Sequence, residues 1–261
     1  IVEKSSSVGG TWHDNKYPGC CCDVWSMLYS YSFEQNPDWT REYPGQEEIL
    51  GVSHAELMTL ADPVRTQAYL QAIAEKYGLY KYIRFNTAVE EARWDDKEQK
   101  WKVGVKVIGA KDSEFAPAYT ITSDYLVSAV GQLNSPRYPQ ISGLDSFKGK
   151  MMHSARWDWS YPLEGKGLQL SETVRIMRTT QYAIANITIG ATAAQIIPEV
   201  AKVASRVTVY QRSPNWVIPR ADAPVSALKR ALLKYIPPIR WRIRAMQMDY
   251  RESFYDAVTD K

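Results

Sequence analysis

The chain has 261 residues, of which 45% are hydrophobic and 12% aromatic, enough for a buried core in one large or two modest domains. This composition excludes an intrinsically disordered chain. The 32 basic and 29 acidic side chains leave a net charge of +3, which gives no reason to expect a nucleic-acid partner. Because no apolar run approaches the roughly 18 residues of a membrane span, we expect no such span and a cytoplasmic location.

The first residues, "IVEK", are typical of a short strand that ends at Glu3. An acidic residue at such a strand end can accept hydrogen bonds from the ribose of an unphosphorylated adenosine. Gly9 and Gly10 would let a ligand approach the backbone closely. An ordinary strand and loop with a surface glutamate explains the same residues. Because the chain opens with Ile1 inside this strand, we expect an upstream portion to be missing.

The cysteines Cys20, Cys21 and Cys22 are consecutive, and His13 is the only histidine near them in sequence. Neighbouring side chains point in different directions and lack the C-x-x-C spacing of a metal site. We therefore expect no metal, and reduced thiols in a cytosolic protein.

Residues 68–143 predict a helix, a β-hairpin, two further strands and a connecting segment, in this order. Apolar spacing predicts a helix over residues 68–80 that stops near Gly78. Alternation around a polar turn at residues 95–100 predicts a β-hairpin. Residues 119–131 predict two further strand segments, and the Pro- and Gly-containing residues 132–143 predict a connection between domains.

The stretch "IGATAAQIIPEVAKVASRVTVYQRSPN" predicts half of a dinucleotide-binding fold. Gly190 would form the phosphate turn, a helix would run from about residue 193 to 204, and an apolar strand would end near Arg212. Arg212 follows Gly190 by 22 residues, and an arginine there favours the 2′-phosphate of NADP. The first glycine of the turn is replaced by Thr188, so simple helix–strand packing at Gly190 remains an alternative.

The run "FKGKMMHSARWDWS" contains the last histidine of the chain. In a structural role His153 would cap a turn with Trp157 packed beneath it. The run also matches F-x-G-x-x-x-H-x-x-x-W followed by Asp158, and so resembles the fingerprint of Baeyer–Villiger monooxygenases. Three further segments look like this family: "GGTWHDNKYPGCCCDVWSMLYSYSF", "NPDWTREYPGQEEIL" and "ATAAQIIPEVAKVASRVTVYQRSPNW".

The resemblance implies an α/β fold with two incomplete dinucleotide-binding (Rossmann-like) domains and a small β-hairpin or meander. Residues 1–135 would be a partial FAD-binding domain, 136–163 a linker that carries the fingerprint, and 164–261 a partial NADP-binding domain. Residues 51–67 and 167–188 do not fit the family pattern. We interpret both as insertions from translated introns or mispredicted exons, the second replacing the strand before the phosphate turn.

The resemblance also implies the cofactors FAD and NADP(H). The expected FAD contacts are Glu3, Gly9, Gly10, Thr11, Trp12, Asp23, Tyr29 and Val89, while His13 and Asp14 align with contact positions but differ in type. The expected NADP contacts are Cys22, Asp23, Gly190, Ala191, Thr192, Gln195, Arg212 and Ser213. His153 and Trp157 would couple the two domains during catalysis, and His153 is not expected to act as a general base.

The implied activity is reduction of the flavin by NADPH and insertion of one oxygen atom of O2 into a small ketone, which gives an ester or lactone. Alternatives are an N- or S-oxygenating flavin monooxygenase and a catalytically dead flavoprotein remnant or scaffold. A third is membrane-surface binding by the basic residues 228–246, but Pro237 and Pro238 interrupt any amphipathic helix there. We expect the chain alone to be an inactive fragment that holds FAD weakly or not at all.

Overall fold

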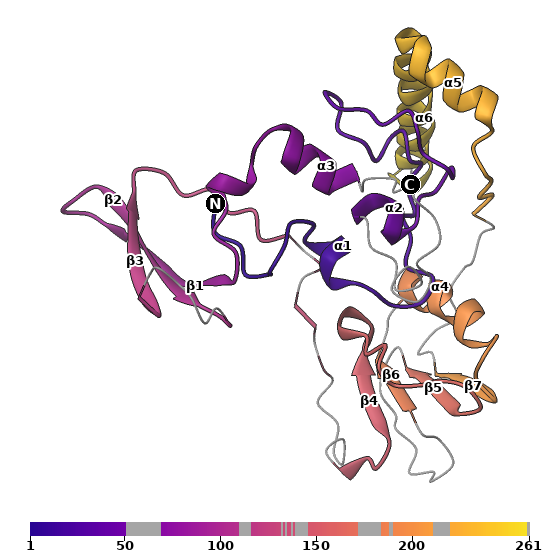
Figure 1. The fold of residues 1–261 in the computed structure, drawn as a ribbon, viewed down its shortest axis with the longest axis horizontal. Helices are drawn as coiled ribbons and strands as arrows, with labels where there is room; N and C mark the ends of the chain where they lie inside the picture. The colour runs from indigo at the N-terminus through magenta and orange to yellow at the C-terminus, as the bar shows by residue number, and fades with distance from the viewer. Residues whose placement is uncertain are drawn as a thin grey trace. The chain divides into compact units, whose positions relative to one another are not determined.

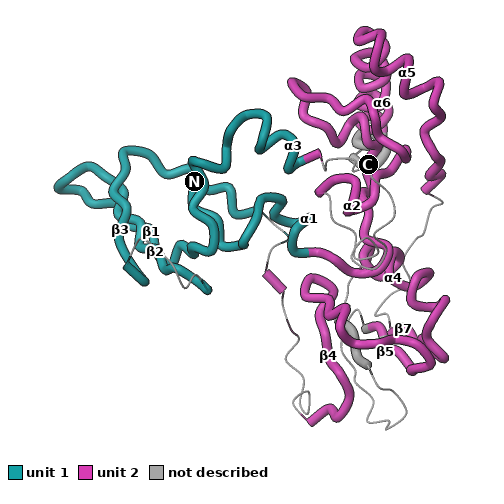
Figure 2. The backbone as a smooth tube through the Cα atoms, in the orientation of Figure 1, with its two compact units in different colours: residues 1–14, 70–134 teal, residues 15–69, 135–261 magenta. Residues whose placement is uncertain are grey.

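The chain forms two compact units (Figure 2), residues 1–14 with 70–134 and residues 15–69 with 135–261. The computed structural model describes residues 1–50, 69–109, 116–131, 133, 135–136, 138, 146–171, 184–187, 190–210 and 220–259, without the side chains of 169, 171, 184–187 and 254–259. The domain boundaries expected from the sequence differ from these units and stay a prediction.

The first unit contains a three-stranded antiparallel sheet in the order β1-β2-β3 (Figure 1). Its strands are β1 (Thr87–Asp95), β2 (Lys100–Val107) and β3 (Ala118–Ser123). The predicted hairpin is therefore confirmed. Its turn forms because the Asp95 carboxylate accepts hydrogen bonds from the backbone N–H groups of Lys97 and Glu98, at 2.9 and 3.1 Å.

Short helices complete this unit: α1 (Thr11–Asp14), α3 (Tyr69–Lys76) and the 3₁₀ helix η2 (Tyr80–Tyr82). The predicted stop near Gly78 is confirmed, since Gly78 has φ 59° and the Leu79 N–H donates to the carbonyl of Ala74 at 2.8 Å.

The second strand predicted within residues 119–131 is wrong, because residues 124–131 follow β3 as irregular backbone. Tyr125 and Val127 are highly exposed there. Hydrophobic alternation alone does not make a strand, which also needs a hydrogen-bonded neighbour.

The second unit contains a four-stranded parallel sheet, β4 (Lys150–His153), β5 (Gly167–Ser171), β6 (Ile184–Ile187) and β7 (Arg206–Tyr210), in the order β4-β6-β5-β7. Helix α4 (Ala191–Val200) connects β6 to β7. The helix and strand expected after Gly190 are thus confirmed.

The core of this unit includes buried side chains of α4 and β5, namely Ala193, Ile196, Val200, Leu168 and Leu170. Both β5 and β6 come from the segment that we interpret as an insertion, and that interpretation stays a hypothesis. Residues 51–67, the other such segment, lie outside the described residues.

The remaining helices of the second unit are α2 (Gln46–Leu50), the 3₁₀ helix η4 (Ser154–Arg156), α5 (Ala227–Tyr235) and α6 (Pro237–Thr259). The Ser226 hydroxyl caps α5 by accepting from the Lys229 N–H at 3.2 Å. Pro237 occupies the first position of α6, where its missing N–H leaves no helical bond unmade. None of the helices in the described part of the chain is long and apolar enough to cross a membrane.

We predict that Gly19→Ala destabilises the protein by roughly 2–4 kcal/mol, whereas Gly165→Ala costs about 1 kcal/mol. Both glycines have positive φ, at 74° and 69°. A Cβ on Gly19 would lie 2.6 Å from the backbone oxygen of Gln195, while nothing lies within 4 Å of one on Gly165. Urea unfolding of the two variants separates the steric clash from the backbone strain. Equal losses in the free energy of unfolding would show that the clash at Gly19 contributes nothing.

Candidate functional site

The carboxyl edge of the parallel sheet brings the fingerprint histidine close to the phosphate turn. His153, the last residue of β4, pairs with Ile187, the last residue of β6. Because the two strands are parallel, their carboxyl ends share one edge of the sheet, and Gly190 follows Ile187 by three residues. Ligands of open α/β sheets bind at this edge.

The amino end of α4 is suited to an anion. Gly190 is its N-cap, has φ 58° and makes no side-chain capping hydrogen bond. The Gly190 carbonyl accepts from the N–H groups of Ala193 and Ala194 at 3.0 and 3.3 Å. The N–H groups of Ala191 and Thr192 open the helix without intrahelical acceptors, and the helix dipole favours negative charge there. These residues fit a phosphate group.

The side chain of Gln195 fastens the loop of residues 17–22 to α4. Its Oε1 accepts from the Tyr17 hydroxyl at 2.9 Å and from the Cys21 N–H at 3.3 Å. Its Nε2 donates to the Cys21 carbonyl at 3.1 Å. Burial raises the pKa of Tyr17, so the phenol remains a hydrogen-bond donor. The expected contact of Gln195 with NADP stays a prediction, but this amide already holds a loop.

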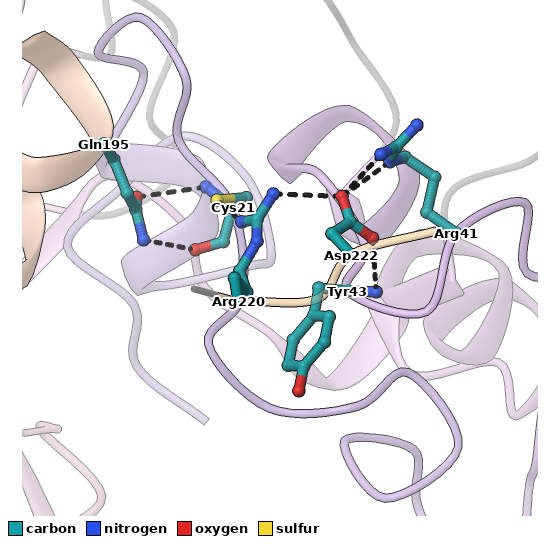
Figure 3. Close-up of polar contacts among 6 residues, drawn as sticks. All are labelled: Cys21, Arg41, Tyr43, Gln195, Arg220 and Asp222. Atoms are coloured by element: carbon teal, nitrogen blue, oxygen red, sulfur yellow. Dashed lines mark hydrogen bonds and ion pairs between the residues drawn. The ribbon is translucent and has the colours of Figure 1, made fainter. Parts of the chain in front are cut away.

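A network of charged groups continues from this loop (Figure 3). The Arg220 guanidinium donates to the Cys21 thiol and, at 3.0 Å, to the Asp222 carboxylate. Asp222 also accepts from Arg41 through Nε at 2.8 Å and Nη2 at 2.6 Å, and from the Tyr43 N–H at 3.2 Å. Only 9% of its side chain is exposed. The carboxylate thus ties residues 41–43 to residues 220–222, and Arg220 links both segments to Cys21.

Sequence reasoning missed Tyr17, Arg41, Arg220 and Asp222. Arg41 and Asp222 are 181 residues apart, and no local pattern marks either residue. An antiparallel bridge between Arg41 and Pro224 brings the two segments side by side.

The three cysteines are free thiols. Burial raises the pKa of Cys20 and of Cys22 to about 12. Burial also raises the pKa of Cys21, against the opposing effect of Arg220. The thiols are therefore protonated at neutral pH and are poor nucleophiles. Within the ranges that the structure describes, no group of three His, Cys, Asp or Glu residues could hold a metal ion.

His153 caps the turn that follows β4. Its Nδ1 accepts the N–H of Ala155 at 3.1 Å, at the start of η4. The Tyr138 ring contacts the imidazole edge-on, with centroids 5.5 Å apart. Burial, and then the charge of Arg156, lower the pKa of His153. The capping role that the sequence left open is present, and the coupling role stays a prediction.

The end of the fingerprint is held by polar contacts. Lys150 pairs with Asp158 at 2.6 Å, and its hydrogen bond is the main reason that the pKa of Asp158 falls to about 2. The Trp159 indole N–H donates to the Lys16 carbonyl at 2.6 Å, and its ring lies 6.1 Å from that of Trp157. Trp157 therefore follows a short turn that is anchored on both sides.

In the first unit, the expected adenosine-binding residues surround a compact turn. The Glu3 carboxylate accepts from the Ser5 N–H at 2.7 Å and retains acceptor capacity for a ribose hydroxyl. Gly9 and Gly10 have φ 124° and 49°, and no atom lies within 4 Å of a Cβ built on Gly10. Thr11 begins α1 immediately after these glycines. The arrangement fits the close approach of a dinucleotide.

The other expected cofactor contacts are spread over both units. Val89 lies on β1 next to a β-bulge, and half of its surface is exposed. Asp23 and Tyr29 are exposed in the second unit, where Cys22 is buried. Arg212 and Ser213 lie outside the described residues. The roles of all these residues stay predictions.

Comparison with known proteins identifies the class. The model of the flavin-binding monooxygenase-like family matches residues 3–226, and the chain belongs to this family. It is 52% identical over 258 residues to the FAD-binding monooxygenase ktnD of Aspergillus niger, a match that covers 99% of the chain and 37% of that protein. It is 38% identical over 255 residues to a Baeyer–Villiger monooxygenase of Streptomyces coelicolor, covering 95% of the chain and 41% of that protein.

Solved structures agree with the family assignment. A closed crystal structure of cyclohexanone monooxygenase matches with a TM-score of 0.70 and 27% identity, over 92% of this chain and 38% of that one. OTEMO in complex with FAD and NADP matches with a TM-score of 0.67 and 30% identity, over 91% and 39%. The expected α/β class with incomplete dinucleotide-binding domains is confirmed, and the chain spans about two fifths of the length of its relatives.

We predict that His153→Ala lowers the free energy of unfolding at pH 7.5 by about 1 kcal/mol through loss of the cap, whereas His153→Asn loses little. The pH dependence of the free energy of unfolding should also differ between the wild type and His153→Asn. The folded state binds His153 protons less readily than the unfolded state, so the wild type should lose stability as the pH falls below about 6.5. His153→Asn should lack this loss. Urea unfolding at pH 7.5 and 5.0 measures both effects, and identical pH profiles would contradict the second.

We predict that Gln195→Glu costs about 1–3 kcal/mol at pH 7.5, because a carboxylate oxygen would replace the Nε2 donor facing the Cys21 carbonyl. Stability should partly recover near pH 5, where a protonated carboxyl group can donate again. Gln99→Glu is the control, since Gln99 also donates to a backbone carbonyl but is exposed. Thermal unfolding at both pH values provides the measurement. A loss as small as that of the control would show that the Gln195–Cys21 hydrogen bonds do not hold the loop.

Proposed function

We propose that the chain provides FAD- and NADPH-binding residues of a Baeyer–Villiger monooxygenase, which inserts one oxygen atom of O2 into a ketone to give an ester or lactone. The observation that carries this proposal is the position of the fingerprint. His153 and the helix start after Gly190 share the carboxyl edge of one parallel sheet. The likeness to proteins named as Baeyer–Villiger monooxygenases supports the reaction type.

In this proposal, Gly190, Ala191 and Thr192 hold the pyrophosphate of NADPH through backbone N–H groups at the start of α4. Arg212 binds the 2′-phosphate, because its guanidinium can make charge-assisted hydrogen bonds to phosphate oxygens. Gln195, Ser213, Cys22 and the exposed Asp23 complete the expected contacts.

For FAD, Glu3 accepts from the adenosine ribose, while Gly9 and Gly10 leave room for the dinucleotide next to α1. The other expected contacts are Thr11, Trp12, Val89, Asp23 and Tyr29. When bound, FAD and NADPH supply the electron and oxygen transfer, so these side chains bind, orient and exclude water.

His153 serves this reaction as a hydrogen-bond donor. Its Nδ1 accepts the Ala155 N–H, and the lowered pKa keeps the ring neutral at pH 7, so the proton is on Nε2. The Nε2–H group can donate to a ligand at the sheet edge, while Trp157 follows on the anchored turn. A group in this state donates a hydrogen bond without acting as a general base.

We predict that Arg212→Ala raises the Kd for NADP⁺ by about 10- to 100-fold, because a hydrogen bond between charged groups is lost. The Kd for NAD⁺ should hardly change, since NAD⁺ lacks the 2′-phosphate. Arg206→Ala is the matched control, because Arg206 is an exposed arginine at the start of β7. Isothermal titration calorimetry of the purified wild-type chain and of the two variants measures both dissociation constants. Equal losses with both nucleotides would refute the assignment of Arg212.

The reaction is tested in a chimera in which the 261 residues replace the matching part of the Streptomyces coelicolor relative. Lactone from cyclohexanone and NADPH is the expected product. Oxygenation of amines or sulfides without any lactone would favour an N- or S-oxygenating enzyme instead. The chain alone should give no product, because it spans 37% to 41% of the length of curated relatives.

A further inference from the structure

Arg244 of α6 makes an unusual set of hydrogen bonds within the second unit. Its Nη1 donates to the backbone carbonyl oxygens of Met27, Leu28 and Ser30, at 2.7, 2.9 and 2.7 Å. One guanidinium nitrogen carries two hydrogens, so at least one of them is shared between two oxygens. The side chain therefore holds three successive parts of one turn at a single point.

A positive group is favourable beside the carbonyl oxygens of residues 27–30. The N–H groups of Leu28 and Tyr29 both donate to the Trp25 carbonyl, at 2.9 and 2.8 Å, which winds residues 25–29 into a helical turn. Carbonyl oxygens at the end of such a turn carry partial negative charge and lack the next turn's donors. An arginine satisfies them, and its charge offsets the convergence of three oxygens.

Other contacts seat α5 and α6 against residues 25–43, whose segment lies beside both helices (Figure 1). Lys229 pairs with Glu42, and Lys234 pairs with Asp38 at 3.2 Å. The rings of Trp25 and Tyr250 meet edge to face, with centroids 5.5 Å apart. These contacts hold the helices in place, whereas the Arg244 bonds reach both sides of Tyr29.

We propose that Arg244 is a positioning residue, which fixes the turn of residues 27–30 so that the exposed Tyr29 is presented to the flavin. The proposal rests on the proposed function for the role of Tyr29, and it adds a residue of α6 to the flavin-binding machinery. Arg244 itself does not touch the cofactor. It acts through the backbone that carries Tyr29.

The experiment compares the wild-type chain with Arg244→Met, Arg244→Lys and the control Arg242→Met. Arg242 is an exposed arginine on the same helix. Hydrogen exchange at amides 28–31, measured without flavin, should accelerate about tenfold or more in Arg244→Met, because three carbonyls lose their donor. Arg244→Lys keeps the charge and should restore part of the protection, while Arg242→Met should match the wild type.

The second measurement is FAD affinity, from quenching of flavin fluorescence, in a double-mutant cycle with Tyr29→Ala. It uses the chimera with the Streptomyces coelicolor relative, because the 261 residues alone are expected to hold FAD weakly or not at all. Arg244→Met should weaken FAD binding in the wild-type background and add no further loss in the Tyr29→Ala background, because both changes remove the same contact. Additive losses would overturn the proposal, since Arg244 would then affect folding in general rather than Tyr29. Unchanged amide exchange in Arg244→Met would overturn it as well.

The two measurements separate this proposal from the proposed function. A chimera in which Tyr29→Ala leaves FAD affinity unchanged overturns the flavin role of Tyr29, and with it that part of the proposal. Faster exchange in Arg244→Met with a lysine rescue would still support Arg244 as the residue that fixes the turn.

Discussion

The described part of the second unit depends on the pairing of one side-chain amide with the backbone of one residue. Gln195 bonds to both the N–H and the carbonyl of Cys21, as a neighbouring strand would. Gly19 lies so close to the backbone of α4 that a Cβ has no room. The loop of residues 17–22 is thereby held against α4. The same helix offers its amino end to a phosphate, so the loop and the predicted dinucleotide site share one support.

Ion pairs around Asp222 connect further segments to this loop. Asp222 accepts hydrogen bonds from two arginines and a backbone N–H while nearly enclosed by protein. Removing either arginine would leave a poorly solvated carboxylate, which is costly, whereas the complete set neutralises and satisfies it. Arg220 passes the connection on to the Cys21 thiol. The network thus runs from α4 through the cysteine loop to residues 220–222, which precede α5. Arg244 separately anchors residues 27–30 to α6.

The fingerprint shows how a structural and a functional role can coincide. His153 accepts a backbone N–H at the start of η4, which explains a histidine at a turn without any ligand. The same bond sets the tautomer, so Nε2 is left as a donor at the sheet edge where Gly190 begins α4. Lys150 and Asp158 hold the turn closed beneath it. The proposed coupling role therefore needs the cap rather than competing with it.

The sequence by itself determined the family, the hairpin around Asp95 and the helix that stops before Gly78, because periodicity, turn residues and spaced fingerprints are local properties. It also determined the strand–turn–helix around Gly190. Only the tertiary structure decided that Gln195 binds Cys21, that Asp222 gathers Arg41 and Arg220, and that Arg244 holds the Tyr29 turn. The strand expected within residues 124–131 failed for the same reason that these contacts were missed. Backbone pairing, side-chain hydrogen bonds and ion pairs depend on partners up to about 200 residues away in the chain, and no local pattern specifies which partner will be near.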